Sequence, residues 1–177
     1  MANTTRQPSG DVAVGNWGTA PLWSKVNEGS GAPDATYIVS PNNSNTTCEL
    51  SVQDPNPAGT YTQVEVKVYA RKDAAAGNQR GLDADIRINA GLQGQKTQQV
   101  NLDAAWTEYS QTWAGLSFTK AQMASLQVSL ISTGTTGGPG GNRREVWIDY
   151  CELILTYTPG GGVKKSSIVI LAGAKRR

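Results

Sequence analysis

The chain has 177 residues, of which 38% are apolar and only 17% are charged, and 20 glycines accompany many Ser, Thr, Asn and Gln residues. This composition fits one domain of short strands joined by turns, and it argues against a helical bundle. The formal net charge is +2, and there is no histidine, which excludes sites built on the commonest general base and transition-metal ligand.

The two ends of the chain differ from its middle. Residues 1–16 are polar and contain glycine, which predicts an N-terminal arm. Residues 17–159 carry the strand patterns and are the predicted β-sandwich domain. Residues 160–177 start with three glycines, which make a flexible joint, and continue into a short apolar run between cations. We therefore expect a Gly linker followed by a basic and apolar C-terminal arm.

Alternation of apolar and polar residues predicts about eight strands and almost no helix. The clearest strand is residues 62–71, where Val64, Val66 and Val68 share one face. Short strands at regular spacing predict an all-β fold, an antiparallel β-sandwich of the jelly-roll type with extended terminal arms. In chain order the predicted strands are residues 35–40, 47–52, 62–71, 83–90, 95–102, 106–114, 126–132 and 144–158.

Two further segments have distinct patterns. Residues 119–124 are expected to form one helical turn, with Thr119 as its N-cap. Residues 144–158 are apolar on both faces, which is typical of a strand in the centre of a sheet or between two layers.

No pattern in the sequence indicates catalysis, and we expect no enzyme, no cofactor and no metal centre. The glycine-rich residues 134–141 lack the Gly-Lys-Ser/Thr ending of a phosphate-binding loop. The carboxylate pair Asp83 and Asp85 fits exposed strand positions. Asp149 lies among apolar neighbours, so its carboxylate is expected to be hydrogen-bonded or paired with Arg144. A structural calcium ligand is the alternative, although no Asp-rich calcium loop is present.

The cysteines and aromatic residues are open to two interpretations each. Cys48 and Cys151 are expected to be small buried residues, with a cross-strand disulfide as the alternative. The five tryptophans are expected to pack in the core. Tyr69 and Tyr109 are the best candidates for exposed rings on a wet sheet face, where they could stack on sugar rings.

The C-terminal arm is the predicted partner-binding segment. An apolar strand beyond a flexible joint gains free energy only by burial, and Ile168, Val169, Ile170 and Leu171 could add a strand to the sheet edge of a neighbouring subunit. The flanking cations would meet acidic residues of that partner. Five cations without an aromatic residue do not favour nucleic acid. These cations are Lys164, Lys165, Lys175, Arg176 and Arg177.

Neither a signal peptide nor a membrane span is expected. Residues 1–18 lack a basic start followed by an apolar stretch. The longest apolar run, residues 168–172, is far shorter than the ~20 residues that a membrane-spanning helix needs. We therefore expect a chain that is made in a cytoplasm and has no membrane partner.

The order of several short segments resembles a loose group of bacteriophage virion proteins. The segments are Leu22-Trp23-Ser24-Lys25-Val26-Asn27-Glu28, Asp34-Ala35-Thr36-Tyr37-Ile38-Val39-Ser40, Val64-Glu65-Val66-Lys67-Val68-Tyr69-Ala70-Arg71-Lys72-Asp73, Ala105-Trp106-Thr107-Glu108-Tyr109-Ser110 and Val146-Trp147-Ile148-Asp149-Tyr150-Cys151-Glu152-Leu153. The resemblance implies a jelly-roll domain, of the sort also used by carbohydrate-binding modules, on the surface of a phage particle. It implies no catalytic residues.

Two hypotheses about function follow. The first is a non-enzymatic virion protein, most simply a capsid decoration or cement protein, which binds the major capsid protein or other virion subunits through its arms. It would be made in the host cytoplasm, reside in the virion and form a homo-oligomer. The second is a carbohydrate-binding module of a phage fibre or receptor-binding protein, for which Tyr69 and Tyr109 would contact the glycan.

Overall fold

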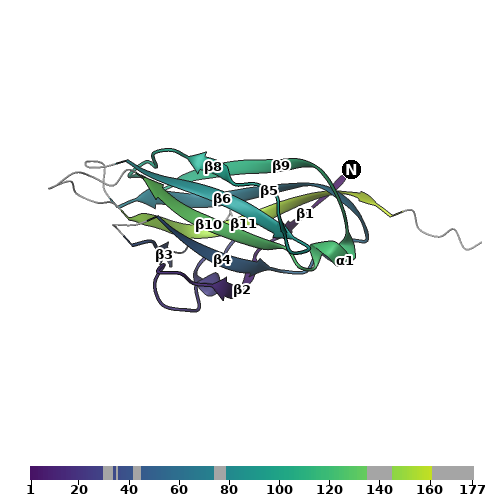
Figure 1. The fold of residues 1–177 in the computed structure, drawn as a ribbon, viewed down its shortest axis with the longest axis horizontal. Helices are drawn as coiled ribbons and strands as arrows, with labels where there is room; N and C mark the ends of the chain where they lie inside the picture. The colour runs from purple at the N-terminus through teal and green to yellow at the C-terminus, as the bar shows by residue number, and fades with distance from the viewer. Residues whose placement is uncertain (30–33, 35, 42–44, 74–78, 135–144, 161–177) are drawn as a thin grey trace, which may run out of the picture.

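The computed structural model describes residues 1–29, 34, 36–41, 45–73, 79–134 and 145–160, and it confirms the predicted antiparallel β-sandwich of the jelly-roll type (Figure 1). Sheet A contains, side by side, β1 (Ala2–Arg6), β11 (Val146–Pro159), β5 (Gly59–Lys72) and β9 (Thr107–Thr119), with β3 (Ile38–Val39) also paired to β11. Sheet B contains β2 (Pro8–Ala13), β4 (Thr46–Val52), β10 (Gln127–Gly134), β6 (Arg80–Ile88) and β7 (Gly91–Leu92), with β8 (Lys96–Gln99) also paired to β6.

The long strands alternate between the two sheets along the chain. β4, β6 and β10 lie in sheet B, whereas β5, β9 and β11 lie in sheet A. Each sheet turns its alternate apolar residues toward the other, as the period of two predicts. The predicted inward positions Val64, Val66 and Val68 of β5 are buried, as are Ala84 and Ile86 of β6.

β11 is the central strand of sheet A, as its apolar character on both faces predicted. It pairs with β5 along one edge and with β1 and β3 along the other. Val146 and Ile148 point into the core, and so do Cys151, Leu153 and Leu155. The inward positions therefore change from even to odd numbers. A β-bulge at Asp149, where the pairing with β5 shifts register, accounts for this change.

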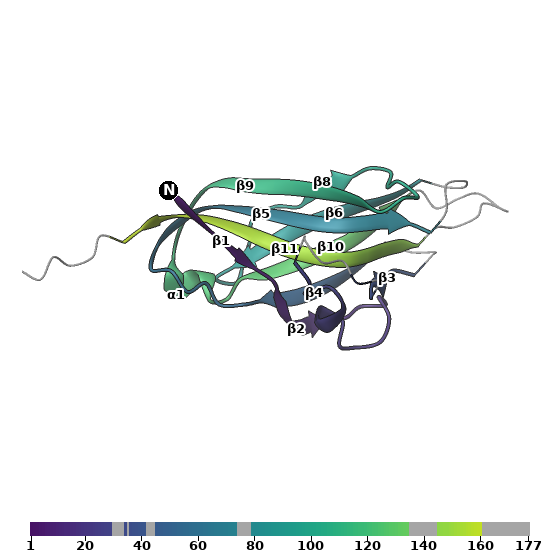
Figure 2. The ribbon, with the colours of Figure 1, turned by 180° about the vertical axis from the view of Figure 1, so that it is seen from behind.

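The N-terminal segment is part of the sandwich, so the prediction that residues 1–16 form an arm is wrong. β1 pairs with β11 from Ala2 opposite Tyr157, and β2 pairs with β4 (Figure 2). Polar side chains suit both strands because each lies at a sheet edge, where the backbone pairing and not apolar burial holds the strand. The prediction of an N-terminal arm was wrong because it relied on apolar periodicity, which edge strands often lack.

Trp17 and Asp11 secure the N-terminal segment to the rest of the domain. The Trp17 side chain is fully buried, and its indole N–H donates to the carbonyl of Thr46 at 3.2 Å. The carboxylate of Asp11 accepts from the backbone N–H groups of Leu22 and Trp23 at 2.9–3.0 Å, just before and at the start of the 3₁₀ turn η1 (Trp23–Lys25). Gly15 has a φ of +53°, and a Cβ there would lie 2.2 Å from the carbonyl oxygen of Thr47.

The helical turn and the shorter strands match the predictions to different degrees. α1 (Lys120–Met123) has Thr119 as its N-cap in a capping box with Gln122, which confirms the predicted cap. The predicted strands 35–40 and 95–102 are shorter in the structure. The predicted strand 83–90 ends two residues early in the structure, at Ile88, and Ala90 lies in a turn with a φ of +65°.

The segment predicted as the C-terminal arm lies outside the described residues from residue 161 onward, and so do Arg143 and Arg144. β11 ends at Pro159, opposite Gly59 of β5, and the N–H of Gly160 donates to the carbonyl of Ala58 at 3.1 Å. In the part of the chain that the structure describes, no helix has the length and apolar character needed to cross a membrane.

Candidate functional site

The outer face of sheet A carries a group of aromatic residues at the end of the sandwich where β11 begins, and it faces the viewer in Figure 2. The pairing puts Trp147 of β11 opposite Arg71 of β5 and Tyr150 opposite Tyr69. Their strand neighbours Ile148 and Ala70 point into the core, so these four side chains point outward. We call the group the aromatic cluster; it consists of Tyr37, Tyr69, Arg71, Trp106, Trp147 and Tyr150.

The members of the aromatic cluster stack on one another. The rings of Tyr37 and Trp147 are parallel within 10°, with centroids 4.6 Å apart. The guanidinium carbon of Arg71 lies 4.3 Å from the Trp147 ring centroid and 5.1 Å from that of Trp106. Tyr69 then stacks on Trp106 at 5.5 Å. Each such contact contributes roughly 0.5–1.5 kcal/mol, so together they hold the rings in a defined arrangement.

The aromatic cluster is fixed on its inner side by a polar contact. Tyr69 stacks on Tyr150 at 5.4 Å, and the Tyr150 hydroxyl donates to the carboxylate of Glu108. Burial first, and then this hydrogen bond, raise the pKa of Tyr150 well above its usual value. The same bond, with Lys67 at 2.9 Å, lowers the pKa of Glu108. Glu108 is therefore engaged with both residues as an ionised acceptor.

One of the two tyrosines proposed for glycan contact is on this face, and the other is not. Tyr69 lies on the outer face of sheet A and is half-buried in the aromatic cluster. Tyr109 lies opposite Val68, which points inward, and it is only 9% exposed. Its hydroxyl group donates to the carboxylate of Asp103 at 3.1 Å. The expectation that Tyr109 is exposed is wrong, because the odd-numbered residues Tyr109 and Trp113 of β9 point into the core.

The tryptophans divide between the core and the outer face. Trp17 and Trp113 are buried in the core, and Trp23 packs against it, as predicted. Trp106 and Trp147 are half-buried members of the aromatic cluster instead. A signal existed for Trp147, because it lies between two inward residues of one strand. Trp106 is the first residue of the predicted strand 106–114, but in the structure it lies just before β9, and nothing in the sequence indicated its contacts with Tyr69 and Arg71.

The bulge residue Asp149 belongs to a group of three carboxylates. One oxygen each from Glu28, Asp34 and Asp149 lies within 4.8 Å of the other two. Asp149 is 3% exposed. The pKa of Glu28 is raised, chiefly by burial and also by the neighbouring charges of Asp34 and Asp149, which together outweigh a hydrogen bond from Thr36. The pKa of Asp34 is lowered, because the side chain and backbone of Thr36 donate hydrogen bonds to it. Carboxylate oxygens at this spacing are the ligand type that Ca²⁺ takes.

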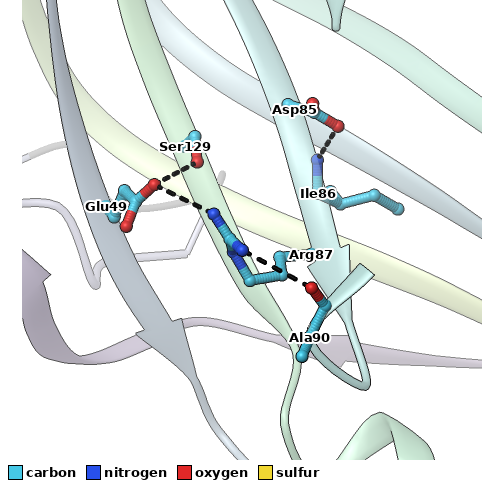
Figure 3. A network of polar contacts seen from close by, with 6 residues as sticks. All are labelled: Glu49, Asp85, Ile86, Arg87, Ala90 and Ser129. Atoms are coloured by element: carbon cyan, nitrogen blue, oxygen red, sulfur yellow. Dashed lines mark hydrogen bonds and ion pairs between the residues drawn. The ribbon is translucent and has the colours of Figure 1, made fainter. Parts of the chain in front are cut away.

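Sheet B carries a network of polar contacts that includes Glu49, Arg87 and Ser129 (Figure 3). None of the aromatic stacks found among the described residues involves these positions. The register places Ser129 between Glu49 and Asp85, and the Ser129 hydroxyl donates to Glu49 at 3.4 Å. Arg87 lies 3.7 Å from the same carboxylate. Asp85 is 6% exposed and accepts from the N–H of Ile86, so its predicted exposure is wrong, whereas Asp83 accepts from Gln95.

The two cysteines are free and fully buried, as the simpler interpretation predicted. Cys48 comes from sheet B and Cys151 from sheet A. Burial raises the pKa of the Cys151 thiol to about 12 and also raises that of Cys48. Both side chains are therefore protonated core residues at neutral pH, with little nucleophilic character.

Comparisons with known proteins found no family for this chain and only distant structural similarities. No protein-family model matches the chain, and no curated protein matches it in sequence. A solved CBM35 domain from Cellvibrio japonicus Abf62 is 14% identical with a TM-score of 0.47, covering 90% of this chain and 100% of that one. A CBM35 domain in complex with a glucuronic acid containing disaccharide is 14% identical with a TM-score of 0.45, covering 92% and 99%.

A viral structure is also similar to this chain. The enzymatically active domain of tailspike protein 4 from bacteriophage CBA120 is 9% identical with a TM-score of 0.43; the match covers 87% of this chain and 19% of that one. Similarities with TM-scores of 0.43–0.47 and identities of 9–14% support no conclusion about the function of this chain. Any conclusion about function must come from the side chains described above.

Proposed function

We propose that this protein is a non-enzymatic binding module that recognises a glycan through the aromatic cluster on sheet A. The observation that supports the proposal is the position of Trp106 and Trp147 on the outer face of a sheet, where a monomeric sandwich normally carries polar residues. Aromatic rings combine apolar contact area with little conformational freedom, so they bind a partner at a low entropic cost.

The cluster has the mixed chemistry that a sugar requires. Its rings offer apolar surface to the C–H groups of a pyranose, while no hydrogen bond to another described residue engages the hydroxyl groups of Tyr37 and Tyr69. These hydroxyls are available to sugar hydroxyls. The stacking described above holds the rings in place before a ligand arrives, so binding requires little rearrangement.

Replacing Trp106 with alanine is expected to weaken glycan binding about 30-fold, because removal of a central aromatic contact costs roughly 2 kcal/mol. Tyr69→Ala should have a similar effect. Leu92→Ala, which removes an exposed apolar side chain elsewhere on the domain, is the control and should bind like the unaltered chain. The measurement is a broad glycan array followed by calorimetry on the best ligand. Absence of any glycan ligand on the array would refute the proposal.

A second candidate is a virion structural protein that decorates or cements a capsid, as a homo-oligomer. It is favoured by the way the chain leaves the sandwich: β11 ends at Pro159, paired with Gly59 at the end of sheet A. Residues 1–162 hold 11 Lys and Arg against 14 Asp and Glu, a net charge of −3, whereas the last fifteen residues hold five cations and no acid. Such a basic segment would meet an acidic partner surface.

A chain that ends at Pro159 is expected to fold with nearly unchanged stability but to lose binding to capsids, because every strand among the described residues ends at or before that residue. Cosedimentation with purified capsids that lack this protein measures the binding, and thermal unfolding of the shortened chain measures its stability. The full-length chain is the control. Equal cosedimentation of the two chains would show that the C-terminal segment does not carry the interaction.

A further inference from the structure

Arg71 provides a positive charge at the centre of the aromatic cluster, and its position is constrained on both sides. Its guanidinium carbon is 4.3 Å from the Trp147 ring centroid and 5.1 Å from the Trp106 ring centroid. The three side chains come from β11, from β5 and from the residue just before β9. A planar guanidinium held between two indoles has already lost much of its rotamer freedom, so ordering it for a ligand costs little.

Among the described residues, no hydrogen-bond acceptor engages the donors of this guanidinium. Across residues 1–29, 34, 36–41, 45–73, 79–134 and 145–160, no side-chain hydrogen bond of Arg71 is found, and no carboxylate lies within 4.0 Å of it. Its Nε atom is buried without a partner. All 14 acidic side chains of the chain belong to the described residues, so none of them supplies the missing counterion.

Two acids that contact members of the aromatic cluster are engaged with other groups. Glu108 accepts from Lys67 and Tyr150, and Glu145 accepts from the indole N–H of Trp147 at 2.9 Å. Of the guanidinium nitrogens only Nε is buried, so the terminal N–H groups remain accessible to an anionic ligand. The fork of a guanidinium matches a carboxylate in a two-bond geometry, which a neutral hydroxyl cannot reproduce.

We propose that the aromatic cluster selects an acidic glycan, in which the carboxylate of a hexuronate residue pairs with Arg71 while the sugar ring lies against the neighbouring aromatic rings. This inference rests on the proposed function, because it names the ligand class of the same site. Charge complementarity identifies the occupant: no carboxylate among the described residues pairs with the Arg71 cation, and the tyrosine hydroxyls beside it can hydrogen-bond with sugar hydroxyls.

A matched pair of ligands tests the inference on the unaltered protein. Oligogalacturonate is compared with the same oligomer after chemical reduction of its carboxyl groups, by calorimetry at low salt. We expect the acidic oligomer to bind about 10- to 100-fold more tightly, the range that a hydrogen-bonded charge pair supplies. The difference should shrink as the salt concentration rises.

Variants of Arg71 test the same point from the protein side. Arg71→Gln should bring the ratio of the affinities for the acidic and the reduced oligomer close to one. Because Arg71 also packs against Trp106 and Trp147, the affinity for both oligomers is expected to fall, and the ratio is therefore the readout. Arg71→Lys, which keeps the charge but loses the planar fork, should restore only part of the preference. Arg87→Gln is the control, because Arg87 is a half-buried cation on the opposite sheet, where it lies near Glu49. Thermal unfolding of each variant confirms that it is folded.

The outcomes separate this inference from the proposed function. Equal affinity for the two oligomers, unchanged by Arg71→Gln, would overturn the inference and leave glycan binding intact. Binding of neither oligomer, together with an empty glycan array, would overturn both. Poly-L-glutamate serves as the competitor that carries carboxylates without sugar rings. If it displaced the acidic oligomer at equal carboxylate concentration, the assignment of the ligand to a glycan would be wrong.

Discussion

Deletion of Asp149 is expected to prevent the chain from folding, although the residue is only one of fourteen in β11. Asp149 occupies a β-bulge, so the residues before it and after it point inward with opposite parity. Without the extra residue, an unbroken pairing with β5 would turn one half of the strand outward. Leu153 and Leu155, both fully buried, would then face water.

The expected loss is large in comparison with the stability of a domain. Exposing two leucines costs about 3–6 kcal/mol, and Tyr150 would have to enter the core at the same time. A domain of this size has a total stability of about 5–15 kcal/mol. Circular dichroism and urea unfolding of the purified variant measure the effect. The control is Asp149→Asn, which keeps the number of residues and should fold. Cooperative unfolding of the deletion variant within about 1 kcal/mol of the unaltered chain would contradict the proposed role of the bulge.

Replacing Trp17 with alanine is expected to lower the free energy of unfolding by about 3–5 kcal/mol, the usual cost of removing a fully buried large aromatic side chain. Trp17 is 0% exposed and also donates its indole N–H to Thr46. Its loss would leave a cavity in the core and remove a contact between the N-terminal segment and β4.

Urea unfolding at neutral pH measures this loss. Trp23→Ala is the matched control, because Trp23 is only partly buried at the edge of the core, and its loss should be clearly smaller. If Trp17→Ala cost less than about 1 kcal/mol, the N-terminal segment would behave as a loosely attached arm, as its polar sequence suggested, and the description of β2 as part of the sandwich would need revision.

Only part of the aromatic cluster could be predicted from the sequence. Alternation within the strand placed Tyr69 on the outer face, because its neighbours Val68 and Ala70 must point inward. It did not bring Trp106 or Tyr37 to the cluster, although both belong to predicted strands, because their contacts depend on how distant strands pair. Alternation also misplaced Tyr109, which lies opposite the inward residue Val68 and therefore points into the core.

The period of two and the spacing of turns determined the all-β antiparallel sandwich, most strand positions and the capped helical turn. These features depend on local alternation of apolar residues and on local hydrogen bonds, which the sequence contains directly. The tertiary structure alone decided that residues 1–13 are edge strands, since backbone pairing with a distant partner leaves no apolar pattern. It alone brought Arg71 between Trp106 and Trp147, because three strands that are far apart in the chain must pair before those side chains can meet.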